Sequence, residues 1–292
     1  MAAFPTISPQ IAALLSALFW ALGIVLLKKG EQGSVTTRNL FRHILATLFF
    51  GIVLFTCCVQ WQPLLSKDWI LLGVSSLFGI VLSETFFLKS LQLMGAGKTT
   101  LITMLYSPIV VLFSVVLLNE SLSLLEIIGG LLMITATLFV LQKGKKHFTP
   151  LAITYALFSV VTSALGTIVL KPLFTDLPIL QITFMRLALS LVPLFMINHF
   201  RNGSLLRDLA TNFKENMTLT TITGILLADG VAILFWMISL KEGSVAHVTL
   251  LGQSAPLLVL LLSATFLKEK LPHFTPIALL GSIIGAVLLI YS

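Results

Sequence analysis

Charged residues are scarce in this chain. Asp, Glu, Lys and Arg together make up 10% of the 292 residues, against about a quarter in an ordinary soluble domain. Hydrophobic residues make up 57%, and the mean hydropathy is +1.06. A soluble domain with so few charged groups has too little polar surface to cover its core. The composition therefore excludes a soluble globular protein and indicates an integral membrane protein.

Cysteine is also rare, since the only two, Cys57 and Cys58, are adjacent in an apolar run. Neighbouring cysteines seldom form a structural disulfide, and no CxxC or His-rich spacing is present. The sequence therefore predicts no metal and no cofactor, and we expect both cysteines to be small buried residues. HExxH, GxSxG and P-loop motifs are absent, which argues against a membrane-embedded enzyme. A sensor or assembly protein without net flux is a further alternative.

Ten apolar runs are long enough for a membrane helix, which needs about 20 residues. Their approximate ranges are 9–28, 36–59, 69–92, 97–118, 122–141, 151–171, 178–198, 217–240, 245–267 and 274–291. The basic residues that follow the first run, with no cleavage site, make it a first span and not a signal peptide. The net charge of +7 is spread over short loops. No basic face for nucleic acid forms, so we expect lipid and a small molecule as partners.

The second half of the chain repeats the first. The stretch ALGIVLLKK (21–29) returns as ALGTIVLKP (164–172), and further matches follow in the same order at separations that grow from 143 to 149 positions. The matched pairs are Lys28 and Lys171, Arg42 and Arg186, Glu84 and Asp229, Gly95 and Gly243, Pro108 and Pro256, and Glu120 and Glu269. One duplication with small insertions explains this order. We expect a first unit over 9–141, a basic connecting loop over 142–150, and a second unit over 151–291.

Five spans in each unit, an odd number, place the second unit upside down relative to the first. Loops on the side of both termini would carry three basic residues, Lys67, Lys171 and Lys241. The opposite side would carry fourteen, namely Lys28, Lys29, Arg38, Arg42, Lys89, Lys98, Lys143, Lys145, Lys146, Arg201, Arg207, Lys214, Lys268 and Lys270. Because basic loops stay in the cytoplasm, we expect both termini on the periplasmic side of a bacterial inner membrane.

Two longer stretches occupy matching places in the units, SPIVVLFSVVLLNESLS and APLLVLLLSATFLKEKLP. With the ten spans and the paired arginines, they resemble the drug/metabolite transporter superfamily of the EamA type, over essentially the whole chain. The resemblance implies an all-helical fold of two inverted five-helix bundles around a central cavity, lined mainly by spans 3, 4, 8 and 9, with help from 1, 2, 6 and 7. It also implies transport, often export, of amino-acid-like metabolites. Inverted repeats are typical of secondary transporters that work by alternating access.

Two acidic residues, Glu84 and Asp229, lie inside apolar spans at matched positions. A charge at the bilayer centre costs about 2.5–3.5 kcal/mol on insertion scales, so such a residue usually faces a cavity or a partner. One or both would bind a substrate amine or take up a coupling proton, and Asp229, nearer its span's centre, is the stronger candidate. The alternative is a structural hydrogen bond or an ion pair with Arg186.

Arg186 lies about eight residues into its span, so its side chain is too deep in the membrane to reach the interface easily. Its guanidinium is suited to hold a substrate carboxylate through two parallel hydrogen bonds. A structural pairing with an acid is equally compatible with its position. Its repeat partner, Arg42, lies closer to the basic side, where we expect it to anchor the span.

Pro108 and Pro256 fall at the midpoints of spans 4 and 9. A proline inside a helix removes a backbone donor and frees a carbonyl. We expect both to line the cavity at a fixed kink, with a moving hinge as the alternative. The hydrogen-bonding residues beside them are Tyr106, Ser107, Gln253 and Ser254.

Aromatic and small residues add further candidates. Trp20 and Trp236 would stack on a substrate ring or close a gate, although tryptophans in spans more often pack or lie at the interface. His43 and His247 lie near span ends, and a histidine there can titrate between pH 5 and 8, although a lone one near an interface is more often a tolerated amphipathic residue. The stretch GSIIG over 281–285 has the spacing of close helix contacts. It marks either packing within the bundle or the face of a homodimer, so the sequence fits a monomer or a homodimer.

Overall fold

The computed structural model describes residues 7–28, 35–94, 99, 102–141, 150–202, 218–266, 268 and 275–292. Within these ranges every regular element is helical. Seven helices are long and apolar enough to cross a membrane, and three shorter apolar helices accompany them. Together they follow the ten expected spans in order. The expected connecting loop over 142–150, apart from its last residue, and most of the expected basic loops lie outside the described residues.

Each half contributes the same succession of helices. The first half contains α1 (Pro9–Lys28), α2 (Val35–Thr56), α3 (Ser66–Ser76), η1 (Leu77–Leu82), α4 (Ser83–Met94), α6 (Tyr106–Leu118) and α7 (Leu124–Leu141). The second half contains α8 (Pro150–Ile168), η2 (Lys171–Thr175), α9 (Ile179–Asn202), α11 (Leu219–Ile225), η3 (Leu226–Val231), α12 (Ala232–Glu242), α13 (Val245–Gly252), α14 (Ala255–Phe266) and α15 (Thr275–Ile290). The π-turns η1 and η3 interrupt the third and eighth spans, as π-bulges often do beside functional sites.

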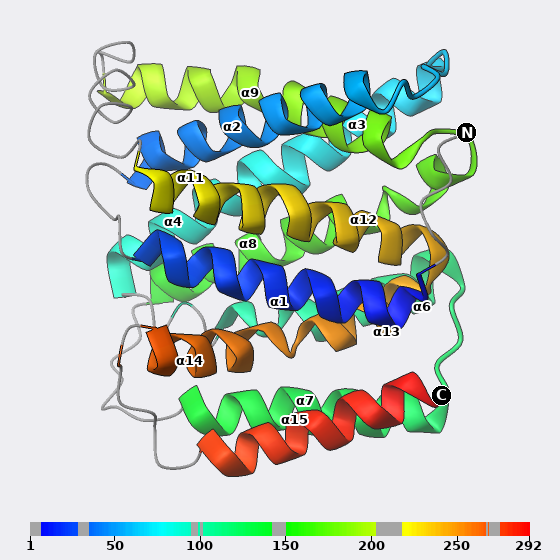
Figure 1. Cartoon of the computed structure of the whole chain (residues 1–292), viewed down its shortest axis with the longest axis vertical. Helices are drawn as coiled ribbons and strands as arrows, with labels where there is room; N and C mark the ends of the chain where they lie inside the picture. Colours follow the sequence, from blue (N-terminus) through cyan, green and yellow to red (C-terminus); the bar gives the residue numbers. More distant parts are fainter. Residues whose placement is uncertain are drawn as a thin grey trace.

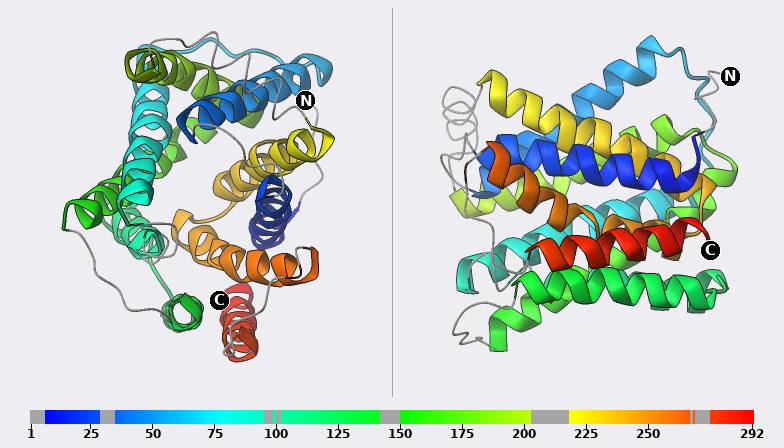
Figure 2. Two further views of the ribbon diagram at one scale, coloured as in Figure 1. Left: turned by 90° about the vertical axis from the view of Figure 1, so that its left-hand side faces the viewer. Right: turned by 60° about the horizontal axis from the view of Figure 1, so that its bottom comes forward.

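The first helix of each half packs against the other half. Helix α1 of the first half lies against α12 and α14 of the second, and α8 of the second half lies against α4 and α6 of the first. The pair α2 and α9 closes one end of the molecule and the pair α7 and α15 the other (Figures 1 and 2). The start of α1 and the end of α15 lie at the same edge (Figure 1). Since five passes carry the chain to the opposite edge, the second half starts there and is inverted.

Glycines of the repeated motifs meet where the halves cross. A Cβ on Gly23 of α1 would lie 2.6 Å from the backbone oxygen of Gly224 in α11, so a larger residue there would collide with backbone. The equivalent crossing places Gly166 of α8 directly against the backbone of Gly79 in η1. Close backbone approach at small residues is a main source of helix association in lipid. The repeated ALG motif is therefore a contact between the halves.

The glycines of the stretch 281–285 pack inside the bundle, the first of the two roles expected for it. A Cβ on Gly285 of α15 would lie 2.7 Å from the backbone oxygen of Gly129 in α7. A Cβ on Gly281 would lie 3.3 Å from the Cβ of Ala136 in the same helix. These small residues therefore bring α7 and α15 together.

Spans 4 and 9 are broken in two, where the sequence predicted continuous kinked helices. The backbone N–H of Leu105 donates to the carbonyl of Ile102 at 3.0 Å, and that of Gln253 donates to Leu250 at 3.0 Å. These bonds to the third preceding residue are tight 3₁₀-type turns. They occupy matching positions of the repeat. In span 9 the turn separates α13 from α14, and in span 4 it precedes α6.

Pro108 and Pro256 lie in the first turns of α6 and α14, just after these breaks. A first-turn residue needs no intrahelical partner for its N–H, so proline is well tolerated there. Proline also cannot donate to the fourth preceding carbonyl, which belongs to Met104 in span 4 and to Gly252 in span 9. The sequence was therefore right that these prolines interrupt the spans, but they begin new helices.

The cysteines are exposed, and the expectation of burial was wrong. Helix α2 ends at Thr56, short of the expected end of the second span at position 59. Cys57 and Cys58 follow in a turn, where Cys58 has a φ of 46° and both side chains face outward as free thiols. Both cysteines are exposed because they follow the end of the helix. The apolar run had predicted that the helix would continue past them.

Candidate functional site

Two adjacent cavities lie at the centre of the bundle. The larger has a volume of about 540 Å³ and the smaller about 320 Å³. Residues that line both are Trp20, Tyr106, Ser163, Ile233 and Trp236. The linings come from all spans except the fifth and tenth, formed by α7 and α15. This agrees with the central cavity that the resemblance implied.

The larger cavity, here called the apolar chamber, is lined mostly by small and apolar side chains. These are Ala13, Ala17, Phe87, Met104, Ala228, Ala232, Ala255 and Pro256. A few polar residues interrupt this lining, namely Ser16, Thr103, Thr249 and Gln253. Gln253 and Pro256 lie at the break of span 9, as expected, whereas Pro108 lines neither chamber. An apolar lining with a few polar groups is typical of small-molecule sites.

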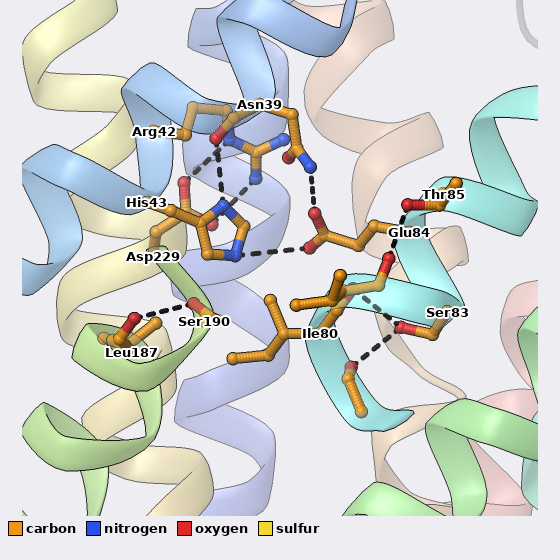
Figure 3. Close-up of polar contacts among 12 residues, drawn as sticks. Asn39, Arg42, His43, Ile80, Ser83, Glu84, Thr85, Leu187, Ser190 and Asp229 are labelled. Carbon is orange, nitrogen blue, oxygen red and sulfur yellow. Dashed lines mark hydrogen bonds and ion pairs between the residues drawn. The ribbon is translucent and has the colours of Figure 1, made fainter. Parts of the chain in front are cut away.

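The smaller cavity, here called the polar chamber, contains an ion pair between the halves. Nε and Nη2 of Arg42, on α2, donate to Oδ2 and Oδ1 of Asp229, in η3, at 2.8 and 2.7 Å (Figure 3). This two-point geometry is the strongest form of arginine–carboxylate contact. The sequence predicted Arg42 as an interface anchor, and an ion pair of Arg186 with one of the two acids was an alternative. In the structure Arg42 forms the pair with Asp229 instead, because α2 packs directly on η3.

Glu84, the other intramembrane acid, also faces α2. Its Oε2 accepts a hydrogen bond from the side-chain amide of Asn39, and its Oε1 lies 3.5 Å from Nε2 of His43 (Figure 3). Asn39, Arg42 and His43 are three and four residues apart, so they share one face of α2. Neither Asn39 nor His43 was predicted as a site residue, although this spacing in NLFRH was the available signal. Both intramembrane acids therefore converge on α2.

Arg186 enters the polar chamber from α9 without an acidic partner. No carboxylate among the described residues forms a salt bridge with it, and its Nε has no hydrogen-bond partner there. Its Nη2 lies where a Cβ on Gly79 would be 2.6 Å away, so glycine makes room for the guanidinium. The relation between the halves would pair Arg186 with Glu84 as Arg42 pairs with Asp229. In this conformation Glu84 contacts Asn39 and His43 instead.

The remaining candidates divide into two groups. The hydroxyl of Tyr106 lies 2.9 Å from Oγ1 of Thr167, and Trp20 and Trp236 border both chambers. Ser107 and Ser254 are buried beside the helix breaks, outside both linings. Within the described ranges their hydroxyl oxygens have no hydrogen-bond partner.

The edge where α1 begins and α15 ends is here called the terminus edge. There α13 of the second half is hydrogen-bonded to the first half. Both carboxylate oxygens of Glu120 accept backbone N–H groups at the start of α13, from Val245 at 2.7 Å and Ala246 at 3.0 Å. A carboxylate is favourable at this positive end of a helix. Nδ1 of His247 also lies 2.9 Å from Oε1 of Glu126.

The same edge carries two further contacts between the halves. The side-chain oxygen of Gln181 accepts from the backbone N–H of Gln62 at 2.9 Å, and its amide donates back to the Gln62 carbonyl at 2.7 Å. Lys67 donates to Asp176 at 2.9 Å, and this hydrogen bond holds the pKa of the exposed Asp176 carboxyl below its usual value. Together with the Glu120 and His247 contacts, these bonds hold the halves together on the terminus edge.

Comparisons with known proteins point to transport. The EamA-like transporter family matches residues 7–142 and again residues 150–291. A protein of Archaeoglobus fulgidus named an uncharacterized transporter is 25% identical over 291 residues, covering 96% of each chain. A solved crystal structure, described only as that of a protein, is 18% identical, covers 96% of this chain and 95% of that chain, and superposes with a TM-score of 0.78. At that identity the solved structure supports the fold alone.

Proposed function

Because the chain belongs to the EamA-like transporter family, we propose that it exports a small amino-acid-like metabolite by alternating access, with the movement coupled to protons. The observation that carries the proposal is the guanidinium of Arg186, which faces the polar chamber without a carboxylate partner in the described part of the chain. A guanidinium whose Nε is buried without a hydrogen-bond partner is costly unless it meets an anion. The carboxylate of a substrate would supply that anion.

The charges of the polar chamber favour a zwitterion. Arg42 and Asp229 neutralise each other, which leaves the cation of Arg186 and the carboxylate of Glu84. In the proposal Arg186 binds the substrate carboxylate through its two-pronged geometry, and Glu84 faces the substrate ammonium. The apolar chamber, reached past Trp20 and Trp236, receives the substrate side chain. Together the chambers have the size common for small-molecule sites, about 300–1,000 Å³.

The inverted halves support an alternating mechanism. Two similar halves with exchangeable conformations expose the site between them first to one side and then to the other. In the conformation described here Asp229 is bound by Arg42, and the equivalent pair of Arg186 with Glu84 is not formed. In the proposed opposite conformation Glu84 pairs with Arg186, while Asp229 separates from Arg42. Tryptophans 20 and 236 then act at the boundary between the chambers.

The orientation follows from the positive-inside rule. We place the basic loops in the cytoplasm and both termini in the periplasm of a bacterial inner membrane. The bonds of Glu120, His247, Gln181 and Lys67 then close the periplasmic side. We take residues 9–141 and 151–291 as the two units. The described cavity is complete within one chain, so the proposal needs no second copy.

Exchange in proteoliposomes tests the proposed function. Vesicles loaded with each of the twenty L-amino acids would be assayed for uptake of the same labelled compound, with empty vesicles as the control. We expect at least one amino acid with an apolar side chain to exchange. Its amide derivative, which lacks the carboxylate, should not. Absence of exchange for every compound, in either orientation of the protein, would instead favour a sensor or assembly role.

A further inference from the structure

The position of one hydrogen atom on His43 follows from its partner. Nδ1 of His43 lies 2.9 Å from the backbone carbonyl oxygen of Asn39, one turn earlier in α2. A carbonyl oxygen only accepts hydrogen bonds. Nδ1 must therefore carry the hydrogen, and the second ring nitrogen, Nε2, is the atom whose protonation is free to change.

Nε2 of His43 faces the carboxylate of Glu84. Its distance to Oε1 is 3.5 Å, which is an ion-pair distance and longer than a usual hydrogen bond. The other oxygen of Glu84 accepts from the amide of Asn39. If Nε2 were bare, a lone pair would face an ionised carboxylate oxygen, and the contact would be repulsive. A proton on Nε2 makes the contact attractive.

The other charged groups around this pair are already engaged or lie across the chamber. Arg42 of α2 is bound by Asp229 of η3. Arg186 faces the chamber from α9, and the neutral hydroxyl of Tyr106 faces it from α6. Without the proton the four formal charges of the chamber cancel, and with it the chamber carries one positive charge. Glu84 is therefore the only acid of the chamber without an arginine partner in the described residues.

The site belongs to one half only. The repeat partner of His43 is Leu187, which follows Arg186 as His43 follows Arg42. Leu187 lines the same chamber but cannot titrate. A proton site confined to one half gives the two conformations different proton affinities, as a coupled transporter requires.

We infer that His43 and Glu84 form the proton site of the transporter, with the coupling proton on Nε2 of His43 and Glu84 as its counter-charge. This inference rests on the proposed function, because it gives Glu84 two competing cations, the imidazolium of His43 and the ammonium of the substrate. When the ammonium binds Glu84, Nε2 releases its proton to water on the open side. After the substrate leaves on the other side, Nε2 takes up a proton there, and the ion pair with Glu84 replaces the Glu84–Arg186 pair of that conformation. The result is exchange of one proton for one substrate molecule.

A ligand-free measurement tests the proton site directly. The ring nitrogens of His43 would be observed by NMR in ¹⁵N-histidine-labelled protein in lipid vesicles, with its signals assigned by their loss in His43→Gln. With all spectra recorded at one pH, we expect both ring nitrogens of His43 to carry protons in the wild type. In Glu84→Gln we expect Nε2 to lose its proton while the signals of His247 stay unchanged. Identical His43 signals in the wild type and Glu84→Gln would overturn the proton site.

A transport measurement tests the coupling separately. With the twenty L-amino acids as probes, a proton gradient should stimulate movement several-fold in the wild type and in His199→Gln, a histidine change outside both chambers. In His43→Gln the ratio of movement with the gradient to movement without it should fall to about one, whatever the rate of exchange, since glutamine keeps a donor for Glu84 without titrating. Retained stimulation in His43→Gln would overturn the coupling role. Failure of every probe in the wild type would contradict the proposed function, while the NMR result would still decide the proton site.

Discussion

Arg42 and Asp229 join the two halves of the molecule through two hydrogen bonds of 2.8 and 2.7 Å. The equivalent pair in the repeat, Arg186 and Glu84, is not formed. One arginine therefore fastens the halves while the other faces the cavity. In the proposed function this asymmetry makes Arg42 the structural arginine of the described conformation and Arg186 the arginine that binds substrate.

Loss of either partner of the Arg42–Asp229 pair should destabilise the protein. Asp229→Asn leaves the Arg42 cation without its acid, and Arg42→Gln leaves the Asp229 carboxylate alone. Because the pair is partly exposed to the chamber, at 31% and 15% of the two side chains, we expect a cost of about 2 kcal/mol, between exposed and buried pairs. The double variant should cost less than the sum of the single changes. Thermal unfolding of the wild type, both single variants and the double variant in detergent would measure these losses of stability. If the two single losses add up to that of the double variant, the pair contributes nothing to stability.

Arg186→Lys should weaken substrate binding while the fold is kept. Lysine retains the positive charge but loses the planar two-pronged donor arrangement. We expect the apparent affinity for an exchanged amino acid to fall about 10–100-fold, the cost of roughly one charged hydrogen bond or more. The unfolding temperature should change little, since Arg186 forms no salt bridge in the described residues. An unchanged affinity would identify Arg186 as structural.

Gly166→Ala should damage the crossing between α8 and η1. A Cβ at this position would collide with the backbone of Gly79, and backbone cannot move aside as a flexible side chain does. We expect a marked drop in unfolding temperature and in the yield of folded protein. Gly73→Ala is the matched control, since nothing lies within 4 Å of a Cβ there and alanine favours a helix by about 1 kcal/mol. Equal behaviour of the two variants would contradict the crossing.

Pro256→Ala should slow transport without reducing stability. Alanine restores the backbone donor that proline lacks, so the carbonyl of Gly252 can accept an α-helical bond and the break in span 9 can close. Because Gly252 and Gln253 line the apolar chamber, closing the break changes its shape. We expect several-fold slower amino-acid exchange and an equal or higher unfolding temperature. Full activity would show that the break is not needed for movement.

The sequence predicted the architecture because a membrane restricts it. Apolar runs of sufficient length have few alternatives to spanning helices, and the ordered repeat matches required inversion once each unit had five spans. Glu84, Asp229 and Arg186 were expected at a cavity because charged side chains avoid lipid. All three line the polar chamber.

The pairing of these side chains was beyond sequence reasoning. Asp229 meets Arg42 and not Arg186 because α2 lies against η3, and helix neighbours cannot be deduced from hydropathy. Likewise the N–H groups at the start of α13 that Glu120 binds are backbone groups without a sequence signature. The helix breaks at Leu105 and Gln253 depend on whether the backbone forms 3₁₀-type or α-helical hydrogen bonds at these positions. Pro108 and Pro256 indicated only approximately where the breaks lie.

The most direct test of two inverted halves around an alternately closed cavity is the accessibility of Ser163, which lines both chambers. Ser163→Cys would be placed in a background with Cys57→Ser and Cys58→Ser, and treated with a membrane-impermeant thiol reagent from each side. We expect labelling from the side of the basic loops and little from the terminus edge. Glu120→Ala, added to this background, removes the hydrogen bonds to α13. If these bonds stabilise the closed edge by roughly 1.4 kcal/mol, labelling from the terminus edge should rise about tenfold. Equal labelling from both sides in the parent, or none from either, would contradict the account.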